Sequence, residues 1–162
     1  MQEQISSEVP DWEREKPRKF WDPSRKLLRS IRKYQAINKS SIIGKLISKY
    51  WVLIHRFWSI VTGAEIDLSC QLGGGLLLPH PNGIVIHPKA EIGVNCLIFQ
   101  QVTIGGGDSK PPVISGHVDI GAGAKVLGSI EVGEHAKIGA NAVVVKNVDA
   151  GTTVVGIPAK AV

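Results

Sequence analysis

The sequence predicts a mainly β protein, a parallel β-helix that follows a short α-helical region. Two observations indicate this class. After Gly63 an aliphatic residue returns at six-residue spacing through thirteen hexads, and the composition changes at the same point. All four Trp lie before residue 63, and 17 of 18 Gly lie at residue 63 or later. With 162 residues and 43% hydrophobic residues, the chain can bury a core, which excludes a wholly disordered protein.

The first third of the chain is basic and divides into two parts. Residues 1–62 carry 13 Lys/Arg against 6 Asp/Glu, whereas residues 63–162 carry 6 against 8. Residues 1–22 hold two prolines and little periodicity, so we expect a flexible basic arm. Residues 23–62 repeat apolar side chains at helical spacing and predict two helices, the second capped by Ser40 or Ser41.

The helical region, residues 23–62, allows several interpretations. Lys45, Lys49, His55 and Arg56 interrupt the second helix, so a membrane-spanning role is disfavoured. No known nucleic-acid motif accompanies the positive charge, and we expect no nucleic-acid partner. The main expectation is that these helices pack on their own domain or on a partner subunit. A helix lying at a membrane surface is the other interpretation, because basic and aromatic residues occupy different faces.

The hexad repeat predicts the β-helix in residues 63–162. A six-residue period suits coils of about 18 residues made of three short strands, so this segment holds about four to five coils. The repeated aliphatic residues should point inward and stack: Ile66, Leu72, Leu78, Ile86, Ile92, Ile98, Ile104, Ile114, Ile120, Val126, Val132, Ile138 and Val144. The register slips by two residues at 84–85 and by four within 105–113.

The two cysteines and five histidines limit the chemistry. Two cysteines exclude a disulfide-rich module and a four-cysteine zinc site. Cys70 and Cys96 both fall four residues after a repeat position, where the side chain points inward, so we expect buried thiols and no disulfide. The histidines show no metal-ligand spacing, and we expect no metal. No signal peptide opens the chain, which favours a cytoplasmic location.

Four stretches resemble serine acetyltransferases, a family of hexapeptide-repeat acyltransferases. They are residues 78–86 (LPHPNGIVI), 99–106 (FQQVTIGG), 120–133 (IGAGAKVLGSIEVG) and 152–160 (TTVVGIPAK). The resemblance implies a left-handed β-helix, assembly as a homotrimer, and acetyl-CoA as co-substrate. It also implies acetyl transfer to a hydroxyl group.

The resemblance assigns site residues by position. His80 matches the family's catalytic base, a role that suits imidazole because it titrates near neutral pH. Glu65 matches the acid that orients this base. Positions matching contacts to acetyl-CoA are Gly106, Gly107, Ala122, Lys137 and Ala140. Asn82 and Lys110 are expected to contact the acceptor.

The acceptor is where the sequence departs from the family pattern. The family has an Asp before the catalytic His and an Arg-His pair later, where this chain has Pro79 and Lys110-Pro111. We therefore expect a sugar or glycan precursor as acceptor, as in the short subgroup associated with polysaccharide biosynthesis. Peripheral contact with the inner membrane surface would fit a lipid-linked acceptor. The alternatives are L-serine as acceptor and a non-catalytic trimeric scaffold.

Overall fold

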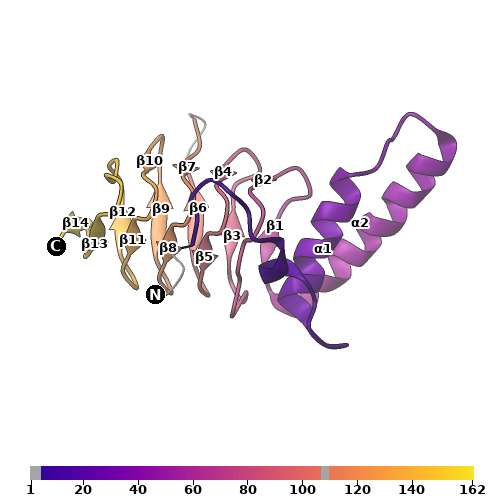
Figure 1. Ribbon diagram of the computed structural model, residues 1–162, viewed down its shortest axis with the longest axis horizontal. Coiled ribbons are helices and arrows are strands. Elements are labelled where there is room, and N and C mark those ends of the chain that lie inside the picture. The colour runs from indigo at the N-terminus through magenta and orange to yellow at the C-terminus, as the bar shows by residue number, and fades with distance from the viewer. Residues whose placement is uncertain (1–4, 107–109) are drawn as a thin grey trace.

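A computed structural model describes residues 5–106 and 110–162. Figure 1 shows a column of β-coils with two helices projecting from one end and the C-terminus at the other. The 3-10 helix η1 (Trp12–Glu15) is followed by α1 (Pro23–Gln35) and α2 (Ile42–Thr62). Within the described ranges, no helix combines the length and apolarity needed to cross a bilayer.

The strands form three narrow sheets that run along the column. The first contains β1 (Glu65–Ile66), β3 (Val85–Ile86), β6 (Thr103–Gly105), β9 (Lys125–Leu127) and β12 (Val143–Val144). The second contains β2 (Gln71–Leu72), β4 (Glu91–Ile92), β7 (Val113–Ile114) and β10 (Glu131–Val132). The third contains β5 (Leu97–Ile98), β8 (Asp119–Ile120), β11 (Lys137–Ile138), β13 (Thr153–Val155) and β14 (Lys160–Ala161).

Stacking of the repeat positions confirms the predicted β-helix. Neighbouring strands in each sheet belong to successive coils and pair in parallel, except the final β13–β14 pair. Ile86 is the Cα partner of Ile66 on one side and of Ile104 on the other. All thirteen repeat residues are buried, and so are most described residues four positions later, such as Ala124, whereas Asn82 is exposed. The six-residue period thus lines the inner side of each of the three sheets with stacked aliphatic side chains.

The helices are bounded by local signals. Pro23 occupies the first turn of α1, where its missing N–H is not needed. Ser41 caps α2, because its hydroxyl accepts a hydrogen bond from the Gly44 N–H at 3.0 Å. Gly63 ends α2 in the left-handed conformation, with φ of 65°, which lets the chain turn into β1.

The described part of the N-terminal arm is packed, which the expectation of a flexible basic arm did not anticipate. Residues 1–22 also carry 4 Lys/Arg against 6 Asp/Glu, so this segment is net acidic rather than basic. It runs back along the coils (Figure 1). The Asn95 amide holds it by donating to the carbonyls of Ser6 and Val9, both at 2.8 Å. Further along, Glu15 is buried and pairs with Arg32 of α1 at 2.8 Å. These polar contacts join residues that are 17 to 89 positions apart, a pairing that local periodicity does not encode.

Candidate functional site

His80 lies on an exposed turn at the base of the β-helix. The two-residue slip in the repeat creates this turn, since it adds length between the first-coil strands and β3. The turn closes through the Ile84 N–H, which donates to the Pro81 carbonyl at 3.2 Å. The Gly83 N–H anchors it on the end of α2 by donating to the Gly63 carbonyl at 2.8 Å. His80 is exposed, as a base that must reach substrate requires.

A groove of about 880 Å³ brings His80 and Asn82 together with the N-terminal arm and the helices. Asp22 lies in its wall and is buried, with its carboxylate accepting from the Arg18 N–H at 3.1 Å. Arg25 reaches the same carboxylate at 3.5 Å. The groove therefore contains one acid, Asp22, and several cations, including Lys19, together with the candidate base.

The charged residues of this groove escaped the sequence analysis. Arg18, Lys19, Asp22 and Arg25 lie 55 to 62 positions before His80, in a segment interpreted as a loose arm or as plain helix surface. The sequence signal for a charged group here was the Asp-Pro pair at the start of α1, but this pair is equally typical of the first turn of a helix. Only the path of the arm across the first coil brings these groups to His80.

Glu65 and His80 do not meet within this chain. Glu65 is exposed on β1 and lines a separate hollow of about 240 Å³ with His55 and Asp67. Among the described residues, no hydrogen bond joins the Glu65 carboxylate to the His80 imidazole. In this hollow, burial lowers the pKa of His55, opposed by the negative charge of Asp67. The orienting role of Glu65 remains a prediction.

Ala122 and Ala140 lie on the same edge of the column as His80. The turns at 82–83, 100–101, 122–123 and 140–141 stack there, linked by backbone hydrogen bonds. The Gln101 N–H donates to Asn82 at 2.9 Å, and the Asn141 N–H donates to Ala122 at 2.8 Å. We call this stack the His80 edge. Small side chains at Ala122 and Ala140 leave its backbone open to an extended ligand.

Gln100 is a second residue that the sequence analysis missed. It lies in the second turn of the His80 edge, and its Oε1 is buried without a hydrogen-bond partner in the described part of the chain. A buried acceptor in this state costs roughly 1–3 kcal/mol, so a donor from a ligand or a second subunit would stabilise it. No periodic signal distinguishes this glutamine from its neighbour Gln101.

The remaining predicted cofactor and acceptor residues lie elsewhere. Gly106 follows β6 on the edge between the first and second sheets, and a Cβ there would come within 2.8 Å of the Gly128 nitrogen. Lys110 is exposed on the same edge, where its carbonyl accepts from Ser129 at 2.6 Å. Lys137 is exposed on β11 of the third sheet. Gly107 lies outside the described residues.

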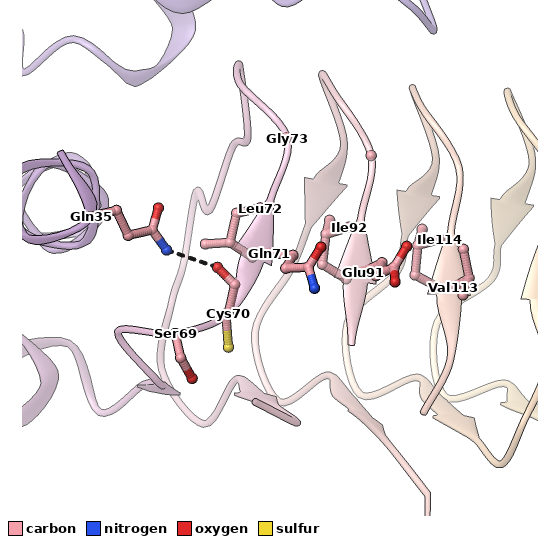
Figure 2. A pocket seen from close by; sticks show the side chains of 11 residues that line it. Gln35, Ser69, Cys70, Gln71, Leu72, Gly73, Glu91, Ile92, Val113 and Ile114 are labelled. Atoms are coloured by element: carbon pink, nitrogen blue, oxygen red, sulfur yellow. Dashed lines mark hydrogen bonds between the residues drawn. The ribbon is translucent and has the colours of Figure 1, made fainter. Parts of the chain in front are cut away.

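A further hollow of about 490 Å³ lies over the second sheet and holds none of the predicted site residues. Figure 2 shows Gln35 of α1 at one end of it, where the side-chain amide donates to the Cys70 carbonyl at 2.9 Å. The Cys70 and Cys96 thiols are buried and unbonded to each other, as predicted. Burial raises the pKa of both thiols to about 11, so neither is a ready nucleophile.

No cluster of three or more His, Cys, Asp or Glu side chains with a metal-binding arrangement occurs in residues 5–106 and 110–162.

Comparison with known proteins agrees with the resemblance. No family model matches the chain. It is 41% identical over 114 residues to the serine acetyltransferase of Synechococcus elongatus, covering 68% of this chain and 47% of that protein. It is 43% identical over 111 residues to that of Mycobacterium tuberculosis, covering 66% and 48%. The chain thus spans about half the length of these curated relatives.

Solved structures give the same result. A serine acetyltransferase in complex with CoA superposes with a TM-score of 0.72 at 31% identity, covering 88% of this chain and 57% of that one. The Neisseria gonorrhoeae serine acetyltransferase in complex with serine has a TM-score of 0.68 at 36% identity, covering 86% and 55%. The chain is therefore similar in sequence to serine acetyltransferases, and it is built on the same hexapeptide-repeat, left-handed β-helix.

Proposed function

We propose that this protein is an O-acetyltransferase that uses acetyl-CoA and His80. The observation that carries the proposal is the exposure of His80 in a groove on the edge that also holds Ala122 and Ala140. The solved relative in complex with CoA supports acetyl-CoA as the donor. A non-catalytic scaffold, the alternative of another class, has no need for an exposed base in such a groove.

In the proposed reaction, the His80 imidazole accepts the proton of the acceptor hydroxyl as its oxygen attacks the thioester carbonyl. The tetrahedral intermediate then collapses, the carbon–sulfur bond breaks, and the imidazolium returns its proton to the leaving CoA thiolate. The products are an O-acetyl ester and free CoA. General-base assistance of this kind contributes about 10²–10⁴ in rate.

L-Serine is the acceptor that the comparisons favour over the sugar expected from the sequence. The relatives described above are named serine acetyltransferases, and none supports polysaccharide biosynthesis. The groove also offers two exposed cations, Arg18 and Lys19, for the carboxylate of an amino acid, whereas the Asp22 carboxylate is buried and already pairs with Arg25. These cations weaken the argument that Pro79 and Lys110 leave an amino acid without charged partners.

A sugar hydroxyl remains the second candidate, favoured by the substitutions at Pro79 and Lys110-Pro111. A cytoplasmic location with peripheral membrane contact belongs to the same hypothesis. Serine and sugar acceptors require the same base, so only an acceptor panel separates them.

A homotrimer would complete the cofactor site. Ala122 and Ala140 lie on the His80 edge, whereas Gly106 and Lys110 lie on a different edge of the same column. Within one chain, these two edges lie on opposite sides of the first sheet. Neighbouring copies around a three-fold axis would bring unlike edges together, which supports the trimer inferred from the resemblance.

The decisive experiment measures free-thiol release from acetyl-CoA with L-serine and with a panel of sugar acceptors. We expect His80→Asn to reduce kcat by about 10²–10⁴ while CoA binding stays unchanged. His87→Asn is the matched control, because His87 is outside the groove. Turnover with sugars alone would establish the second candidate. Absence of both turnover and CoA binding would refute the enzyme proposal and favour the scaffold.

A further inference from the structure

The outer face of α2 exposes a continuous row of large apolar side chains. Their exposed fractions run from 44% to 82%. We call this row the α2 strip: Ile42, Ile43, Leu46, Ile47, Tyr50, Leu53, Phe57 and Ile60. Single exposed apolar residues are ordinary, but a contiguous row of eight along one helix marks an interaction surface.

The α2 strip points away from the rest of the chain. Its members recur at spacings of three, four and seven, so they share one side of the helix. The opposite side of α2 packs against α1 through its buried residues, including His55 and Trp58. There the His55 Nδ1 lies 3.2 Å from the Ser30 hydroxyl. The strip therefore has no partner within the described chain.

Positive charge borders the α2 strip. Lys45, Lys49 and Arg56 are exposed and fall on one flank of it, at spacings of four and seven. None of them forms an ion pair with a described residue. The whole segment from 23 to 62 contains nine Lys/Arg and no Asp or Glu. Whatever covers the strip must tolerate or neutralise this charge.

We propose that α2 binds the surface of a bilayer containing anionic lipid, with the α2 strip in the boundary between headgroups and acyl chains. A helix with an apolar face, a basic flank and a Tyr near its middle suits that position. Anionic headgroups supply the counter-charge that the helices lack. A second copy paired through the same strip would instead bring together two segments with nine cations each and no acids. This inference does not rest on the proposed acetyltransferase activity.

Membrane binding would place the candidate active site close to the lipid surface. Val61 and Thr62, at the C-terminal end of α2, line the groove that contains His80. With α2 lying along the bilayer, the part of the groove lined by the end of α2 would be close to the lipid headgroups. The geometry would suit an acceptor that is presented at the membrane.

The test is co-sedimentation of the full chain with vesicles of phosphatidylcholine containing 30% phosphatidylglycerol, and with pure phosphatidylcholine. We expect binding to the anionic vesicles at 50 mM NaCl and its loss at 500 mM. Each cation near the surface is worth about fivefold in affinity. The variant Lys45→Gln/Lys49→Gln/Arg56→Gln should therefore bind on the order of a hundredfold more weakly. Its matched control is Lys89→Gln/Lys146→Gln/Lys160→Gln on the β-helix, with equal loss of charge.

A second variant, Leu46→Gln/Leu53→Gln, removes apolar area without changing charge and should also weaken vesicle binding by at least tenfold. Both positions are exposed, so helix content by circular dichroism should be unchanged. No binding of wild type to anionic vesicles at low salt would overturn the proposal. So would equal binding by the Lys/Arg variant and its control. If Leu46→Gln/Leu53→Gln instead lowers the mass in sedimentation equilibrium and leaves vesicle binding intact, a second copy covers the strip. Thiol release with a soluble acceptor tests the proposed activity separately.

Discussion

Substitution of Glu15 tests whether one buried carboxylate fastens the N-terminal arm to the β-helix. Glu15 is 7% exposed, and its Oε1 accepts from the Arg32 Nη2 at 2.8 Å and from the Leu76 N–H at 3.1 Å. Its Oε2 accepts from the Arg32 Nε at 3.1 Å. In Glu15→Ala the Leu76 N–H, on a fully buried residue, loses its acceptor and Arg32 loses its counter-charge.

The magnitude follows from these contacts. Removing one partner of a buried ion pair costs about 3–5 kcal/mol. Arg32 keeps its bonds to the Leu72 and Gly73 carbonyls, and its side chain is 21% exposed, so water offsets part of the loss. We expect Glu15→Ala to lower the free energy of unfolding by about 3 kcal/mol. For a chain of this size, that corresponds to about 6–12 °C in Tm. Glu15→Gln, which keeps an acceptor for Leu76, should lose about half as much.

Urea unfolding followed by circular dichroism, at one fixed protein concentration, measures the difference. Glu13→Ala is the matched control, because Glu13 lies in the same 3-10 helix but its ion pair with Lys16 is exposed. The control should change stability by no more than about 0.5 kcal/mol. Equal effects of Glu13→Ala and Glu15→Ala would refute the assignment of Glu15 as the anchor of the arm.

Three further outcomes are expected. Burial lowers the pKa of His55 and of His117 below the value of each in the unfolded chain, so the unfolded state binds protons first as the pH falls. The urea midpoint of unfolding should therefore decrease from about pH 7 to below pH 6. A midpoint that does not change with pH would contradict this. Gly93→Ala places a Cβ 2.4 Å from the backbone of the next coil and should lower the free energy of unfolding in urea by about 1–3 kcal/mol. Gly105→Ala places a Cβ no closer than 3.9 Å to any neighbour, so its free energy of unfolding should be unchanged. With a pKa of about 11, the Cys96 thiol should react with a disulfide reagent at pH 8 only when the chain unfolds, and rapid labelling of the native protein would show that it is accessible.

Much of the fold was predictable because its information is local and repeated. Each hexad turns one aliphatic side chain inward. Because this pattern occurs thirteen times, it strongly favours a β-helix over other architectures. The same six-residue register correctly predicted that Cys70 and Cys96 are buried. The start of α1 at Pro23 and the Ser41 cap of α2 are also local, since capping depends on residues within one turn.

The candidate site was less predictable, since its parts come from distant segments. Motif similarity pointed to His80, and the repeat slip explains why it is exposed. The resemblance placed Glu65 beside it, but the described structure holds Glu65 in a separate hollow. Asp22 and Lys19 share the groove with His80 only because the arm turns back over the first coil. Long-range contacts such as Glu15 with Arg32 hold the arm near this coil, and no repeating pattern predicts them.

The sequence alone determined the β-helix, its buried layers and the position of the candidate base, because a six-residue period repeats one burial rule in every coil. Tertiary structure decided what surrounds that base and what the helices leave exposed. Helical periodicity in the sequence predicts that α2 is amphipathic. Only the packing of α2 against α1 shows which of its apolar residues remain exposed to solvent. The groove charges and the α2 strip depend on where separate segments meet in space, and that is a property of the folded chain rather than of any local pattern.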